Sequence, residues 1–99
     1  MTITKQSSGS SLTLALEGRL DTGTAPQLEE ELNASLGGVT ALTLDMEQLQ
    51  YVSSAGLRVI LAAQKQMNRQ GRMTVRHVCA DIMEVFEMTG FVDILDIEN

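Results

Sequence analysis

Aromatic residues are scarce in this sequence. Only Tyr51, Phe86 and Phe91 are aromatic among 99 residues, and tryptophan is absent. Because few large rings are available, the hydrophobic residues, 43% of the chain, must build an aliphatic core with six methionines as adaptable filler. A chain of this length is typical of one compact unit, and we expect residues 1–99 to form a single domain.

Cysteine and histidine each occur only once, as Cys79 and His77. A single cysteine excludes an intrachain disulfide and a cysteine-based metal site, so we expect neither a metal nor another cofactor. The absence of disulfides is typical of a reducing environment, which predicts a cytoplasmic protein.

Positive charge and long apolar runs are also missing. Seven basic residues stand against thirteen acidic ones, which gives a formal net charge of −6. This sign opposes attraction to nucleic-acid phosphates and to anionic lipid headgroups, so no direct nucleic-acid binding is expected. The longest wholly apolar run, VILAA at residues 59–63, is far too short to span a bilayer, and the N-terminus lacks the apolar segment of a signal peptide. We therefore expect no membrane insertion.

Hydrophobic periodicity predicts alternating strands and helices. Apolar and polar residues alternate in residues 2–5 and 12–17, which predicts a β-hairpin. Thr24 as N-cap, Pro26 in the first turn and Gln27 as capping-box partner predict a helix that ends at the glycines 37–38. The remaining predicted elements are a strand over 41–46 with Asp45 near its carboxyl end, a helix over 54–70, a strand over 73–78, a helix over 80–89 and a short strand or extension within 92–97.

This order of elements predicts an α/β fold. Strands separated by single helices require right-handed crossovers and parallel pairing. We expect a mixed, mostly parallel β-sheet of four to five strands, with an N-terminal hairpin and helices after the second, third and fourth strands. In such sheets, functional groups gather at the carboxyl ends of the strands.

Two hydroxyl residues, Ser53 and Ser54, interrupt the apolar run QYVSSAGLRVIL at one of these ends. A serine directly before a helix is most often an N-cap, whose oxygen accepts a free backbone N–H of the first turn. The same free N–H groups and the positive end of the helix dipole also accommodate a phosphate. The sequence leaves both roles open.

The outer face of the following helix is basic at helical spacing. It carries Ala55, Arg58, Ala62, Lys65 and Arg69. On an acidic chain, such a face is either a docking surface for an acidic partner or an ordinary solvated face.

Catalytic interpretations find little support. SSAG does not match the G-x-S-x-G motif of a nucleophilic serine, and the only histidine, His77, lies on a predicted neighbouring strand. Asp21 and Asp45 either form a carboxylate pair or are loop and strand-end residues that accept backbone N–H groups. We expect a binding protein and not an enzyme.

Three segments together resemble one family over essentially the whole chain. These are LEGRLDTGTAPQLEEEL, LTLDMEQLQYVSSAGLRVILAAQKQM and VFEMTGFVDIL, of which the middle one is the most specific. They resemble the STAS domain family, and in particular the bacterial anti-sigma factor antagonists.

The resemblance implies a partner-switching protein. Members of this kind bind an anti-sigma factor that is also a serine kinase, are released when it phosphorylates them, and are restored by a PP2C-type phosphatase. The resemblance assigns the phosphoacceptor to Ser54, with Asp21 and Asp45 as neighbouring acidic residues. Ser53, where many members have Asp, is the alternative acceptor. The partner-binding residues would be Ser53, Ala55, Arg58, Ala62, Lys65 and Arg69.

A second function remains open within the same family. Some single-domain members are accessory subunits of lipid-transport ABC systems, where they pack on an ATPase without a phosphorylation cycle. In that setting the serines would serve as helix caps.

Overall fold

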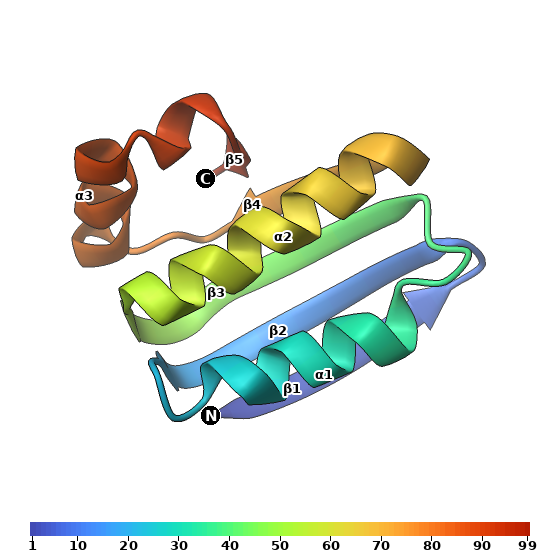
Figure 1. Cartoon of the computed structure of the whole chain (residues 1–99), viewed down its shortest axis with the longest axis horizontal. Coiled ribbons are helices and arrows are strands. Elements are labelled where there is room, and N and C mark those ends of the chain that lie inside the picture. The colour runs from blue at the N-terminus through green and yellow to red at the C-terminus, as the bar shows by residue number, and fades with distance from the viewer.

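Residues 1–99 form a five-stranded sheet in the computed structural model, with the first two helices on one face and the third beside one end of the sheet (Figure 1). This arrangement confirms the predicted α/β fold with an N-terminal hairpin. The elements in chain order are β1 (Thr2–Ser8), β2 (Ser11–Leu20), α1 (Ala25–Ser35), β3 (Ala41–Val52), α2 (Ser54–Gln70), β4 (Arg72–Arg76), α3 (Ala80–Thr89), a 3₁₀ turn (Phe91–Asp93) and β5 (Asp96–Glu98).

The strands lie side by side in chain order. β1 pairs antiparallel with β2, and every other neighbouring pair is parallel. Because each right-handed crossover advances in the same direction, α1 and α2 cover the same face of the sheet, as Figure 1 shows. The carboxyl ends of β2, β3 and β4 therefore point toward one end of the molecule.

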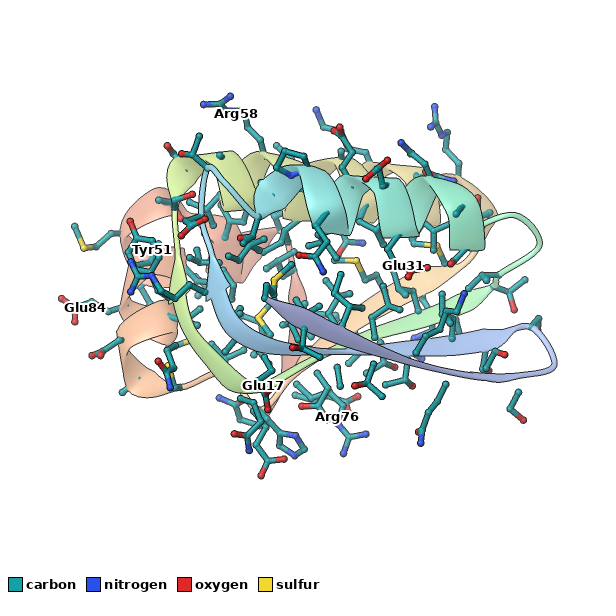
Figure 2. All side chains as sticks on the ribbon, turned by 90° about the horizontal axis from the view of Figure 1, so that it is seen from below. Glu17, Glu31, Tyr51, Arg58, Arg76 and Glu84 are labelled. Carbon is teal, nitrogen blue, oxygen red and sulfur yellow. The ribbon has the colours of Figure 1, made fainter.

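The core lies between this face and the helices. Alternate residues of each strand point inward, because successive side chains of a strand leave opposite faces. The fully buried side chains include Leu14 and Leu16 of β2, Leu42, Leu44 and Met46 of β3, Leu28 of α1, and Ile60 and Met67 of α2. No helix covers the other face, from which Glu17 and Arg76 project in Figure 2.

β3 is twice as long as the sequence predicts. Between Asp45 and Gln48, and again between Leu49 and Tyr51, β3 contains one residue more than the facing segment of β2. These bulges change the spacing of the buried positions from two to three, so the alternation used for prediction breaks after Met46 although the strand continues to Val52. The prediction that the strand ends at Met46, with Asp45 at its carboxyl end, is wrong.

The start of α1 also differs from the prediction. Thr24 occupies the N-cap position, but its hydroxyl donates to the carbonyl oxygen of Arg19 at 2.7 Å instead of capping the helix. The side chain of Gln27 donates to the carbonyl oxygen of Met1 at 3.0 Å, so no capping box forms. The backbone oxygen of Asp21 accepts from the N–H of Ala25 at 2.8 Å, which ties the helix to the preceding loop.

Gln70 and Gly71 fix the end of α2, as predicted for Gly71. The Gln70 amide donates to the carbonyl oxygens of Leu36 and Val39 at 2.7 and 2.6 Å, which links α2 to the loop after α1. Gly71 packs so closely on that loop that a Cβ atom there would lie 1.9 Å from the carbonyl oxygen of Thr40. This junction requires the absence of a side chain.

The C-terminal elements follow the prediction with shifted boundaries. β4 ends at Arg76 because His77 adopts a left-handed backbone with φ of 59°, two residues before the predicted end. Gly90, with φ of 78°, ends α3 as expected, and the short last strand exists as β5. None of the helices combines the length and apolar character that crossing a membrane requires.

Candidate functional site

The two serines at the start of α2 have different roles. Ser53 is the N-cap: its hydroxyl oxygen accepts the N–H of Gly56 at 3.3 Å, and its side chain is half-buried. Ser54 is the first residue of the helix, is exposed, and its hydroxyl makes no hydrogen bond within the chain. The cap role that the sequence left open thus belongs to Ser53, and the hydroxyl of Ser54 is free.

The loop after β2 lies directly beside this junction. The N–H of Ser53 donates to the carbonyl oxygen of Leu20 at 2.9 Å, which joins the ends of β2 and β3. Gly56 packs against the same residue, since a Cβ atom there would lie 2.6 Å from the Leu20 side chain. The loop from Asp21 to Thr24 follows immediately, so it flanks the exposed start of α2.

Asp21 organises this loop. Its carboxylate accepts the backbone N–H groups of Gly23 at 3.0 Å and Thr24 at 3.1 Å, as well as the Thr24 hydroxyl. Desolvation raises the pKa of Asp21, but these hydrogen bonds and the nearby Arg19 guanidinium outweigh it, so the pKa lies below its ordinary value. The carboxylate is satisfied by backbone N–H groups, one of the two roles that the sequence left open.

Asp45 lies far from the serines. Seven further strand residues separate it from the end of β3, a distance of roughly 20 Å for extended backbone. Its side chain points to the open face of the sheet, where it accepts the N–H of Glu47 and contacts His77. Desolvation raises the pKa of Asp45, but the His77 hydrogen bond, the Glu47 N–H and the charge of Arg76 lower it overall. The sequence-based placement of Asp45 beside Ser54, or in a pair with Asp21, is therefore wrong.

The outer face of α2 is largely solvent-exposed, as predicted. Arg58, Lys65 and Arg69, which we call the basic strip, are exposed and form no ion pair within the chain. Ala62 is exposed between them, whereas Ala55 is half-buried beside the β2–α1 loop. Ser54 and Arg58 are four residues apart, so they lie on the same side of the helix one turn from each other.

The structure adds two residues that sequence reasoning missed. Arg19 and Tyr51 are register partners on β2 and β3, and the Arg19 guanidinium lies 4.2 Å from the centre of the Tyr51 ring. Tyr51 is 40% exposed, and it lies toward the same end of the molecule as Arg58 in Figure 2. Tyr51 is the chain's only tyrosine and precedes the serines by two residues, which is the signal that would have identified it.

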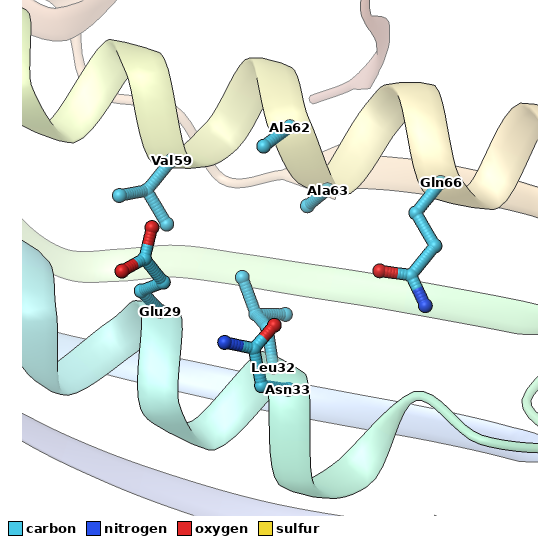
Figure 3. Close-up of a pocket in the computed structure, with 7 residues that line it drawn as sticks. All are labelled: Glu29, Leu32, Asn33, Val59, Ala62, Ala63 and Gln66. Atoms are coloured by element: carbon cyan, nitrogen blue, oxygen red, sulfur yellow. The ribbon is translucent and has the colours of Figure 1, made fainter.

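The surface hollows near this site are shallow. One, with a volume of about 240 Å³, is lined by Thr22, by Pro26 of α1, and by Ala55 and Arg58 of α2. The adjoining groove between α1 and α2, whose residues Figure 3 shows, has a volume of about 60 Å³. Small-molecule sites usually measure about 300–1,000 Å³. The geometry therefore favours a surface that contacts a macromolecule.

Comparison with known proteins identifies the family. Residues 3–96 match the profile of a family described as Mlab, STAS domain. The chain belongs to the STAS domain family. Its fold, with the exposed serine at the start of α2, is thus a STAS fold, as the sequence resemblance suggested.

Its relatives include anti-sigma factor antagonists. BtrV of Bordetella bronchiseptica, which is assigned as an anti-sigma factor antagonist, is 39% identical over 90 residues, covering 89% of this chain and 78% of BtrV. The crystal structure of an anti-sigma factor antagonist from Mycobacterium paratuberculosis has a TM-score of 0.88 at 20% identity, covering 97% of this chain and 83% of that one.

A further similar structure is that of the Bacillus cell fate determinant SpoIIAA in its phosphorylated form. It has a TM-score of 0.77 at 18% identity, covering 99% of this chain and 92% of SpoIIAA. At these identities the two structural likenesses establish the fold. Membership of the STAS domain family is shown by the match to the family profile and by the sequence identity with BtrV.

Proposed function

We propose that this STAS domain is an anti-sigma factor antagonist that binds an anti-sigma factor serine kinase and is released when the kinase phosphorylates Ser54. The observation that carries this proposal is the free, exposed hydroxyl of Ser54 at the start of α2, beside a serine that already caps the helix. The names of the relatives support the function, and a phosphorylated form exists for SpoIIAA. The protein would act in the cytoplasm as a kinase substrate and not as an enzyme.

The docking surface would run from the end of β3 along α2. It combines the basic strip with Ser53, Ala55 and Ala62, and Tyr51 and Arg19 extend it. Tyrosine and arginine are the residue types most often found at energetically dominant interface positions. The small side chains of Ala55 and Ala62 permit close approach of a partner. Because the chain is acidic elsewhere, the basic strip selects a partner with complementary negative charge.

Phosphorylation at Ser54 would change this surface without unfolding the domain. The phosphate adds a charge of about −1.5 to −2 at the positive end of the helix dipole, where the free N–H groups tolerate it. Arg58, one turn along the same side, is in a position to pair with the phosphate. The modification would thereby introduce repulsion toward an acidic partner and withdraw one cation of the basic strip. A PP2C-type phosphatase would reverse both effects.

Affinity capture from a lysate of the source organism tests this proposal. The baits are the wild-type chain, Ser54→Ala and Ser54→Asp, and mass spectrometry identifies the bound proteins. We expect a serine kinase of the anti-sigma type to bind wild type and Ser54→Ala but not Ser54→Asp. Ser8→Asp is the matched control, since it adds the same charge at an exposed serine of β1 outside the docking surface and should bind as the wild type does.

Two results would overturn the proposal. An ABC ATPase that binds all baits equally would make the domain a subunit of a lipid-transport system and leave Ser54 without a regulatory role. A kinase that binds Ser54→Asp as tightly as wild type would exclude control by charge at this position.

A further inference from the structure

Three side chains of metal-binding type meet on the open face of the sheet, far from Ser54. They are Asp45 and Glu47 of β3 and His77, which follows β4. His77 Nδ1 lies 3.0 Å from a carboxylate oxygen of Asp45 and 3.8 Å from one of Glu47, and the three donor atoms lie within 4.8 Å of one another. The mechanism proposed above uses none of these groups.

The fold fixes all three side chains. The first bulge of β3 begins after Asp45, and the N–H of Glu47 donates to the Asp45 carboxylate at 3.1 Å, so both carboxylates face the same side. The left-handed backbone of His77 ends β4 and turns its ring toward β3, and its N–H donates to the carbonyl oxygen of Glu98 on β5 at 3.3 Å. Backbone from β3, the end of β4 and β5 therefore holds the cluster in place.

The spacing fits a shared ion. Tetrahedral ligand bonds of about 2.0–2.2 Å from a Zn²⁺-like ion separate neighbouring donor atoms by about 3.3–3.6 Å. The distances from His77 Nδ1, 3.0 Å to Asp45 and 3.8 Å to Glu47, lie just below and just above this range. Glu47 is exposed, so rotation of its side chain can bring its carboxylate toward both other donors.

The donor set also defines the class of ion. One imidazole and two carboxylates suit divalent transition metals such as Zn²⁺ and Mn²⁺ better than Ca²⁺ or Cu⁺. Arg76, the register partner of Asp45, opposes an added cation, and its own register partner on β5, Glu98, adds a negative charge on the other side. The two carboxylates of the cluster supply the negative charge that attracts a divalent ion.

We propose that Asp45, Glu47 and His77 form a binding site for one divalent transition metal ion, with His77 Nδ1 and one oxygen of each carboxylate as ligands. Solvent completes the coordination because the ligands are partly exposed. The ion joins β3 to the β4–α3 connection, so it stabilises the folded chain. This contrasts with the sequence-based expectation of no metal site, which rested on the absence of a second histidine or cysteine.

The test is a Zn²⁺ titration followed by isothermal calorimetry and by ¹H–¹⁵N spectra. The chain carries Cys79→Ser so that the nearby thiol cannot compete, and the wild-type chain is measured beside it. We expect one ion per chain, with chemical-shift changes centred on residues 45–47 and 77. His77→Asn, which tolerates the left-handed backbone, should weaken binding by at least about tenfold, and Asp45→Asn likewise.

Glu84→Gln is the matched control because Glu84 is an exposed carboxylate on α3 and lies well away in Figure 2 from Arg76, the register partner of Asp45. It should bind Zn²⁺ as the parent does. Thermal unfolding provides a second readout, since Zn²⁺ should raise the Tm of the parent and of Glu84→Gln but not of His77→Asn. The absence of saturable binding below about 1 mM, or equal binding by the parent and His77→Asn, would overturn the proposal and leave only a hydrogen bond between His77 and Asp45.

Discussion

At the scale of single residues, the main finding is that the adjacent serines Ser53 and Ser54 have different roles. A helix start offers one cap position, and Ser53 occupies it through the N–H of Gly56. Ser54 consequently adds nothing to helix capping and presents its hydroxyl to solvent. A modification at Ser54 can therefore act on a partner while the helix keeps its cap.

This division predicts different stabilities for two alanine variants. Ser53→Ala should lower the free energy of unfolding by about 1 kcal/mol because it removes the cap. Ser54→Ala should change it by no more than about 0.5 kcal/mol, as expected for an exposed side chain without a partner. Urea denaturation followed by circular dichroism measures both. A larger loss for Ser54→Ala than for Ser53→Ala would contradict the assignment of the cap.

The Asp21 carboxylate predicts a pH dependence of stability. Because hydrogen bonds lower its pKa in the folded chain, Asp21 stabilises the fold above its unfolded pKa of about 3.9, and this contribution is lost as the pH falls through the folded pKa. The wild type should therefore have a higher Tm than Asp21→Asn at pH 7, and the difference should shrink below about pH 4. A Tm difference that stays constant from pH 7 to pH 3 would rule out this contribution.

At the scale of secondary-structure elements, β3 illustrates what periodicity could predict and what it could not. The alternation of Leu42, Leu44 and Met46 correctly indicated a strand with one buried face. Each bulge then adds one residue to β3. The sequence does not predict these residues, because the pairs Glu47-Gln48 and Gln50-Tyr51 are as typical of a loop as of a bulged strand. Bulges depend on pairing with β2, which is information outside the local sequence.

The contact between Gly71 and the β3 start predicts a steric effect. Gly71→Ala should destabilise the chain by about 1–3 kcal/mol, because its Cβ would overlap the backbone of Thr40. Gly37→Ala is the matched control: no atom lies within 4 Å of its Cβ position, so the variant should be neutral or more stable by up to about 1 kcal/mol. Chemical denaturation distinguishes them, and equal stabilities would show that the close approach is relaxed in solution.

At the scale of the whole molecule, the two faces differ in chemistry. The helical face carries the basic strip beside Ser54, and the open sheet face carries the carboxylates around His77. The sequence located the first surface because Arg58, Lys65 and Arg69 recur at helical spacing. It missed the second because Asp45 and His77 are 32 residues apart and meet only through parallel pairing of β3 and β4.

Charge reversal on the helical face should weaken partner binding selectively. Arg58→Glu and Arg72→Glu each change the net charge from −6 to −8, but only Arg58 belongs to the basic strip. We expect Arg58→Glu to slow association with the captured kinase and to reduce the salt dependence of binding, because it removes an attractive charge from the interface. Arg72→Glu should bind as wild type does. Surface plasmon resonance at several salt concentrations measures this, and equal losses would indicate a non-specific charge effect.

The most direct measurement of the central claim is the position of the phosphate. The captured kinase is incubated with ATP and with the wild type, Ser53→Ala or Ser54→Ala, and tandem mass spectrometry locates the modified residue. Our account predicts one phosphate on Ser54 in the wild type and in Ser53→Ala, and none in Ser54→Ala. Phosphate on Ser53, or a Ser54→Ala chain modified as readily as the wild type, would contradict it.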